Sequence, residues 1–120
     1  MEKIVLACQI VVALGLLNVW LLRASKPTSW RGGEAKNMLE EFRTYGLPTW
    51  FMWVVGFLKV SFALALIAGL WIDQVNRPAA TGIAVLMLGA IAMHLKVGDP
   101  LRKSMPALSM LLLSLVLVIV

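Results

Sequence analysis

Residues 78–120, PAATGIAVLMLGAIAMHLKVGDPLRKSMPALSMLLLSLVLVIV, decide the fold, because two long apolar runs flank one short polar stretch. The first run covers 78–97 and the second covers 100–120. A helix that rises about 1.5 Å per residue needs about 20 residues to cross a bilayer core of about 30 Å. Two such runs joined by a tight corner predict a pair of antiparallel transmembrane helices.

Two further apolar runs lie upstream, at 4–22 and 50–72. Since every run is continuously apolar and does not alternate, helices are favoured over the strands of a membrane barrel. We therefore predict an all-α membrane protein with a single domain over 1–120, built as a four-helix transmembrane bundle. The first run exceeds the apolar core of about 7–15 residues in a signal peptide, so we expect it to be retained as a helix.

The composition favours the same class. The 120 residues are 61% hydrophobic and 14% charged, whereas soluble domains are about 45–50% apolar and about 25% charged. A chain of this length has too little interior to bury so much apolar surface, so lipid is its expected solvent. The net charge of +5 comes from cations beside apolar runs. This arrangement disfavours nucleic-acid binding, which needs a basic face interleaved with aromatic residues.

The long connection between the first two runs contains EAKNMLEEFRTY at residues 34–45. Its apolar residues fall on one helical stripe, and most of its polar residues fall on the other face. We expect an amphipathic helix at 34–45 that lies on the membrane surface or caps the bundle. The stripe consists of Ala35, Met38, Leu39, Phe42 and Tyr45.

The cations are divided unequally between the two sides of the predicted bundle. The side of the long connection carries eight and the opposite side carries two, Lys3 and Arg77. The positive-inside rule then predicts a multi-pass protein with both termini outside the cytoplasm. We expect membrane lipids to be partners, with headgroup phosphates contacting the cations around the corner. These cations are Lys96, Arg102 and Lys103.

The corner itself is encoded by Gly98, Asp99 and Pro100. Gly98 suits the position that ends a helix, Asp99 suits the N-cap of the next helix, and Pro100 suits its first turn. The Asp99 carboxylate is expected to accept hydrogen bonds from the first free amides of the fourth helix.

Lys59 interrupts the second apolar run. An ammonium at the centre of a span costs about 2.5–3.5 kcal/mol, which the surrounding apolar residues outweigh. Gly56 and Ala63 share its helix face, and small residues let helices approach closely, so we expect Lys59 to point inward. It either makes a structural polar contact or binds an anionic or carbonyl-bearing ligand. Candidate structural partners are Glu40, Glu41 and Asp99.

His94 lies one turn before the corner, and Asn18 lies near the end of the first run on the same predicted side. Each could serve as an interhelical hydrogen bond or as a binding group. No serine or cysteine nucleophile is identifiable beside His94, so we assign no catalytic residue and lean against an enzyme. No Cys/His cluster predicts a metal site. The candidate residues for ligand or partner binding are Lys59, His94, Asn18 and Asp99.

Three segments carry a resemblance to a known family: EEFRTYGLP at 40–48, VGFLKVSFALALIAGL at 55–70 and AIAMHLKVGDPLRKSMPAL at 90–108. Through them the chain resembles the DoxX-like family of small four-helix membrane proteins. The His-x-x-Val-Gly-Asp-Pro-Leu run is also similar to that of NACHO, an endoplasmic-reticulum relative that assists the assembly of nicotinic acetylcholine receptors. The chain departs from the family at Lys59, where members often have glutamate.

The resemblance implies the fold more directly than an activity. Some DoxX-type proteins are described as subunits of thiosulfate–quinone oxidoreductases, and others as membrane chaperones. Our first hypothesis is a non-enzymatic, chaperone-like assembly factor that binds a membrane-protein client. The alternative is a redox subunit that binds a quinone or lipid near Lys59 and His94. Under either hypothesis the protein could form a homo-oligomer. Apart from a possible quinone or lipid, we predict no cofactor.

Overall fold

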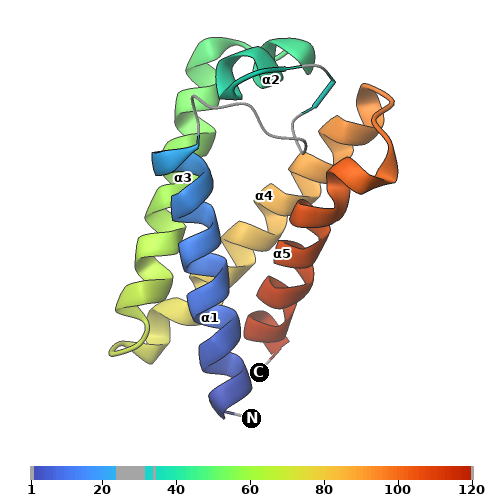
Figure 1. Ribbon diagram of the computed structural model, residues 1–120. Coiled ribbons are helices and arrows are strands. Elements are labelled where there is room, and N and C mark those ends of the chain that lie inside the picture. The colour runs from blue at the N-terminus through green and yellow to red at the C-terminus, as the bar shows by residue number, and fades with distance from the viewer. Residues whose placement is uncertain (1, 24–31, 34, 120) are drawn as a thin grey trace.

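The computed structural model describes residues 2–23, 32–33 and 35–119. Four long helices run side by side, and a short helix, α2, lies across one end of the bundle (Figure 1). Both chain termini lie at the other end of the bundle, away from α2 (Figure 1). The elements are α1 (Glu2–Leu17), a π-helical extension (Asn18–Leu22), α2 (Met38–Thr44), α3 (Thr49–Ala68), a 3-10 turn (Asp73–Val75), α4 (Asn76–Lys96) and α5 (Leu101–Ile119).

Four segments within the described residues are long and apolar enough to cross a membrane, and they confirm the expected all-α, multi-pass class. The second span ends earlier than the apolar run at 50–72 suggests, because the chain turns at Gly69. The Asn76 side chain donates to the Gly69 carbonyl, and a Cβ on Gly69 would lie 1.6 Å from Asn76 Oδ1. The spans are Lys3–Leu22, Thr49–Ala68, Asp73–Lys96 and Leu101–Ile119.

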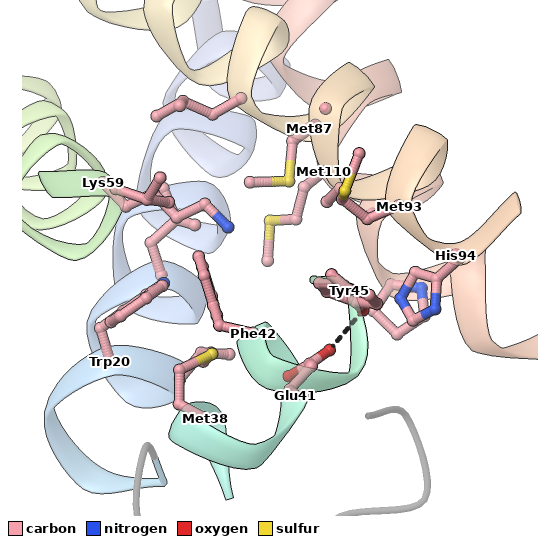
Figure 2. Close-up of a pocket in the computed structure, with 18 of the residues that line it drawn as sticks. Trp20, Met38, Glu41, Phe42, Tyr45, Lys59, Met87, Met93, His94 and Met110 are labelled. Carbon is pink, nitrogen blue, oxygen red and sulfur yellow. Dashed lines mark hydrogen bonds between the residues drawn. The ribbon is translucent and has the colours of Figure 1, made fainter. Parts of the chain in front are cut away.

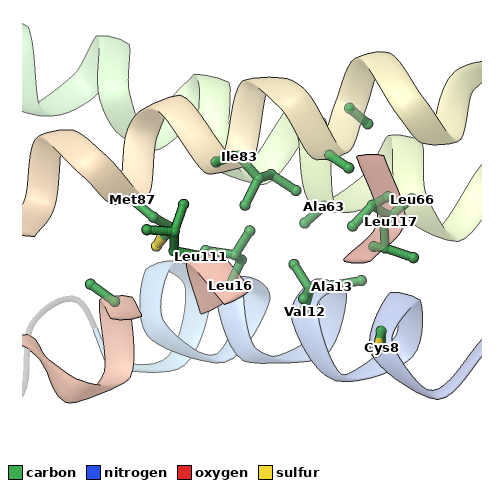
Figure 3. Close-up of a cluster of buried hydrophobic side chains, with 14 residues drawn as sticks. Cys8, Val12, Ala13, Leu16, Ala63, Leu66, Ile83, Met87, Leu111 and Leu117 are labelled. Carbon is green, nitrogen blue, oxygen red and sulfur yellow. The ribbon is translucent and has the colours of Figure 1, made fainter. Parts of the chain in front are cut away.

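The main core lies between the four long helices (Figure 3). Val12 of α1, Leu66 of α3 and Ile83 of α4 are fully buried there. Ala63 and Ala80 are also buried, and such small side chains allow helix backbones to approach closely in a membrane. Many large apolar side chains point outward, as is expected where the solvent is lipid.

Helix α2 caps the bundle at the end distant from the chain termini (Figure 1). It begins after Asn37, whose side-chain oxygen accepts from the Glu40 amide at 2.8 Å as an N-cap. It is therefore shorter than the expected 34–45, and Glu34 lies outside the described residues. Met38, Phe42 and Tyr45 from the predicted apolar stripe are buried against the bundle, so this face points into the protein.

Candidate functional site

A cavity of about 790 Å³ lies beneath α2, with walls from all four long helices and from α2 itself (Figure 2). Sites for small molecules commonly measure about 300–1,000 Å³. Much of the wall is apolar and rich in methionine, and Met87, Met93 and Met110 lie between Lys59 and His94 (Figure 2). Methionine is flexible and polarisable, so such a wall can adapt to occupants of different shape. The methionines are Met38, Met87, Met93 and Met110.

The Lys59 side chain extends from α3 into this cavity (Figure 2). Its Nζ lies 5.5 Å from the centre of the Trp20 ring, a distance suited to a cation–π interaction. In the described part of the chain, no residue makes a hydrogen bond or ion pair with this ammonium. Glu41 is the carboxylate whose charge acts on Lys59, and it belongs to the cavity wall contributed by α2.

Trp20, in the π-helical extension of α1, forms part of the same wall. Its indole Nε1 is buried and has no hydrogen-bond partner among the residues described. The Trp20 ring can pack against α3 because Gly56 has no side chain. A Cβ on Gly56 would lie 2.6 Å from Trp20 Cζ3. The Phe42 ring packs edge-on against Trp20, with centroids 6.2 Å apart. The Lys59 end of the cavity therefore holds two N–H donors, Lys59 Nζ and Trp20 Nε1, that lack an acceptor in the described structure.

His94 lines the opposite end of the cavity (Figure 2). Its Nδ1 lies 2.7 Å from Asp99 Oδ2, and the Tyr45 ring stands edge-on to it at 5.8 Å. Because an ionised carboxylate can only accept, the proton of this contact is assigned to Nδ1. In a neutral imidazole, Nε2 is then an acceptor. Tyr45 in turn donates its hydroxyl hydrogen to Glu41 Oε1 at 2.7 Å.

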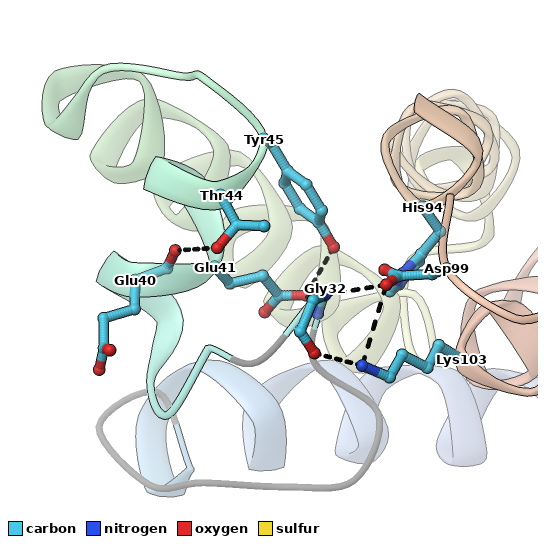
Figure 4. A network of polar contacts seen from close by, with 9 residues as sticks. Gly32, Glu40, Glu41, Thr44, Tyr45, His94, Asp99 and Lys103 are labelled. Atoms are coloured by element: carbon cyan, nitrogen blue, oxygen red, sulfur yellow. Dashed lines mark hydrogen bonds and ion pairs between the residues drawn. The ribbon is translucent and has the colours of Figure 1, made fainter. Parts of the chain in front are cut away.

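Asp99 lies behind His94, at the corner between α4 and α5 (Figure 4). Its side chain is 5% exposed, and Oδ1 accepts from the Gly33 amide at 2.9 Å. Lys103 Nζ lies 3.8 Å from the same oxygen and also donates to the Gly33 carbonyl. Burial raises the pKa of Asp99, but the hydrogen bonds from His94 and Gly33 and the Lys103 charge hold it below its ordinary value. We call Gly33, His94, Asp99 and Lys103 the corner junction.

The DoxX-like family matches residues 29–118. The chain belongs to the DoxX-like family. This DoxX-like protein is also similar to "Uncharacterized protein YdgD" of Bacillus subtilis (strain 168), with 44% identity over 61 residues. The match covers 48% of the chain and 50% of that relative, so the chain spans about half the length of the curated relative it matches. No solved structure matches the chain.

The structure of the DoxX-like protein places three of the four predicted binding residues in one cavity wall: Asn18, Lys59 and His94. Asp99 is not part of the wall, and its carboxylate instead accepts a hydrogen bond from His94 Nδ1. Its carboxylate bonds to Gly33 and His94, whereas the sequence predicted bonds to the amides of the fourth helix. Gly98 has a φ of +73°, the left-handed conformation in which glycine ends a helix. In the residues described, no group of three or more His, Cys, Asp and Glu side chains could hold a metal ion.

The corner cations make contacts within the protein that the sequence did not indicate. Lys96 Nζ donates to the Tyr45 carbonyl at 2.8 Å, and Lys103 contacts Gly33 and Asp99. Both therefore tie the region of α2 to the α4–α5 corner. Arg102 is exposed. Binding of lipid headgroups by these three cations stays a prediction.

Trp20 is the main wall residue that sequence reasoning missed. A tryptophan in the last turn of a span usually marks the membrane interface. No local spacing indicates that it joins the wall, and only its packing against Gly56 shows that the ring turns inward.

We expect the protein to lose folding stability in acid, because the corner junction depends on an ionised Asp99. The pKa of Asp99 is lower in the folded state than the value of about 3.9 for an unfolded chain. Its stabilisation is therefore fully present above that unfolded value and is lost as the pH falls through the folded pKa. Thermal unfolding in detergent across this acid range should show a steeper loss for the native protein than for Asp99→Asn. Equal acid sensitivity of the two proteins would contradict the assignment, and Asp73→Asn, at an exposed position, serves as the control.

Proposed function

We propose that this DoxX-like protein binds a small, membrane-soluble molecule in the cavity between Lys59 and His94. The observation that supports this function is the pair of donors at one end of a largely apolar cavity. Lys59 Nζ and Trp20 Nε1 have no acceptor within the described structure. Trp20 Nε1 is a buried donor, and a buried polar group left unsatisfied costs about 1–3 kcal/mol. A ligand oxygen placed between the two donors would offset that cost.

The cavity suits a quinone or another lipid-like molecule, which is the ligand class proposed from the sequence. An oxygen acceptor would face Lys59 and Trp20, and the apolar body would lie along the methionine-lined wall. His94, oriented by Asp99, would provide a second polar contact at the far end. A redox role would follow only if the bound molecule is itself redox-active, as a quinone is.

The assembly-factor hypothesis would require Lys59 and His94 to contact a client protein. A client helix in the lipid would contact mainly the outer surface of the bundle, whereas Lys59 and His94 line a partly open cavity between the helices. The geometry of these two residues therefore favours a small ligand over a client. Co-purification of a membrane-protein client in mild detergent, retained in Lys59→Met and His94→Gln, would instead support the assembly factor.

A pair of tryptophan variants in α4 tests the ligand. Gly89 belongs to the cavity wall, and a Cβ there meets no atom within 4 Å, so the first atom of a larger side chain fits at this position. Ala92→Trp places the same side chain at an exposed position outside the wall. We expect mass spectrometry of organic extracts to find a bound molecule in the native protein and in Ala92→Trp, and at least about tenfold less in Gly89→Trp. Identical extracts from all three proteins would reject the proposed function.

A further inference from the structure

We infer that the occupant of the cavity is a single-chain lipid with an anionic head, a long-chain carboxylate, whose head lies against Lys59 and Trp20. This inference rests on the proposed ligand-binding function and adds the sign of the ligand's charge and the place of its head. It separates a carboxylate from a neutral molecule such as a quinone, an ester or an alcohol.

The charges on the cavity wall are the first support. Among the residues that the structure describes, Arg23, Lys59 and Lys103 contribute cations to the wall, and Glu41 contributes an anion. Lys103 already lies close to the Asp99 carboxylate, at 3.8 Å. Among these cations, Lys59 is acted on by the charge of Glu41 but forms no ion pair with a described residue, so an anion in direct contact would be a better counter-ion.

The depth of Lys59 is the second support. It lies ten residues after the start of α3 at Thr49 and nine before its end at Ala68, which places it near the middle of the span. An ammonium at this depth is costly because the surrounding lipid and protein solvate charge poorly. A neutral carbonyl oxygen could accept from the ammonium but would leave its charge unbalanced. A carboxylate supplies both the acceptor and the opposite charge.

The arrangement of the donors is the third support. Lys59 Nζ lies over the Trp20 ring at 5.5 Å, so the ring restrains the ammonium near the buried indole nitrogen. A carboxylate has two oxygens with several lone pairs, so it can accept from both groups at once. An alcohol or ketone has a single oxygen, which must serve both donors. One such oxygen has two lone pairs but no charge, whereas a carboxylate can accept from both donors and also balance the ammonium.

The remainder of the cavity matches an apolar chain. The side chains of Met87, Met93 and Met110 lie between the Lys59 end and the His94 end (Figure 2). Flexible thioethers can follow a bent hydrocarbon chain closely. A volume of about 790 Å³ is that of a site for a small molecule, which favours one chain over the two chains of a phospholipid.

The test compares palmitate with hexadecanol, which have chains of equal length and differ in the charge of the head. The full chain, in nanodiscs of zwitterionic phosphatidylcholine at neutral pH, is titrated with each probe, and the rise in Tm gives the affinity. We expect palmitate to bind more tightly than hexadecanol. Lys59→Met should weaken palmitate by about tenfold or more and hexadecanol by clearly less, and Lys59→Arg should retain palmitate binding. Arg102→Met removes the same charge outside the cavity wall and should leave both affinities unchanged.

The outcomes separate this inference from the proposed function. If both probes bind equally and Lys59→Met changes neither, the anionic head is wrong. Loss of that binding in Gly89→Trp would still support a ligand in the cavity. If Arg102→Met weakens palmitate as much as Lys59→Met does, the effect comes from general surface charge and the inference is overturned. If neither probe binds, the long-chain carboxylate is rejected, and the extraction experiment on Gly89→Trp alone decides the proposed function.

Discussion

Asp99→Ala is expected to lower the free energy of unfolding by about 3–5 kcal/mol, the largest effect of any single substitution that we consider. The carboxylate is almost fully buried and accepts hydrogen bonds from the Gly33 amide and from His94. Its removal leaves these donors without their partner and leaves the Lys103 ammonium without its neighbouring anion. Hydrogen bonds to a charged group contribute about 1.5–3 kcal/mol each, so losing two accounts for the range.

Asp73→Ala is the matched control, because Asp73 is exposed in the turn before α4 and a surface substitution usually changes stability by less than about 0.5 kcal/mol. The measurement is chemical denaturation of each variant in the same detergent. Hydrogen exchange gives a second, local measurement, in which amides of α2 and of Gly33 should lose protection in Asp99→Ala. A midpoint for Asp99→Ala equal to that of Asp73→Ala would show that the corner junction contributes nothing.

Leu66→Ala is expected to cost about 2–5 kcal/mol, the second largest effect. Leu66 is 0% exposed and packs in the main core with residues of α1, α4 and α5 (Figure 3). In a membrane the lipid chains are as apolar as leucine, so helices associate mainly through close packing. A void in this core loses those contacts, and the surrounding helices can close it only in part.

Leu64→Ala is the control for Leu66→Ala, since both residues lie on α3 and Leu64 is 53% exposed. It should change stability by less than about 0.5 kcal/mol. Both variants are compared by thermal unfolding in detergent, together with retention of the extracted ligand. Leu66 lies outside the cavity wall, so its variant should lose stability while a folded fraction still retains the ligand. Equal destabilisation by the two substitutions would contradict the packing described for the core.

The sequence by itself determined the class of this DoxX-like protein. Whether a segment crosses a bilayer depends on the length and apolarity of that segment, which are local properties. The run at 78–97 and the run at 100–120 could therefore be identified as spans without knowledge of their neighbours, and both correspond to spans in the structure. The amphipathic stripe of α2 is local in the same way, because Met38 and Phe42 are one helical turn apart.

The wall of the candidate site depended on contacts between segments far apart in the chain. Asn18, Lys59 and His94 were each identified as polar residues within or near apolar runs, but their common cavity follows from how α1, α3 and α4 pack. Trp20 could not be assigned to that wall, because a tryptophan near the end of a span can face lipid or protein. Its direction follows from the absence of a side chain on Gly56, 36 residues away in the chain.

The corner junction shows the same division most clearly. Gly98, Asp99 and Pro100 indicated a helix corner because turn formation depends on neighbouring residues. The partners of that corner were decided only by the tertiary structure: Lys96 meets Tyr45, 51 positions away, and Asp99 meets Gly33, 66 positions away. Local sequence specifies where a backbone turns and where it enters lipid. It does not specify which distant groups meet a buried charge, because that depends on the packing of all the helices together.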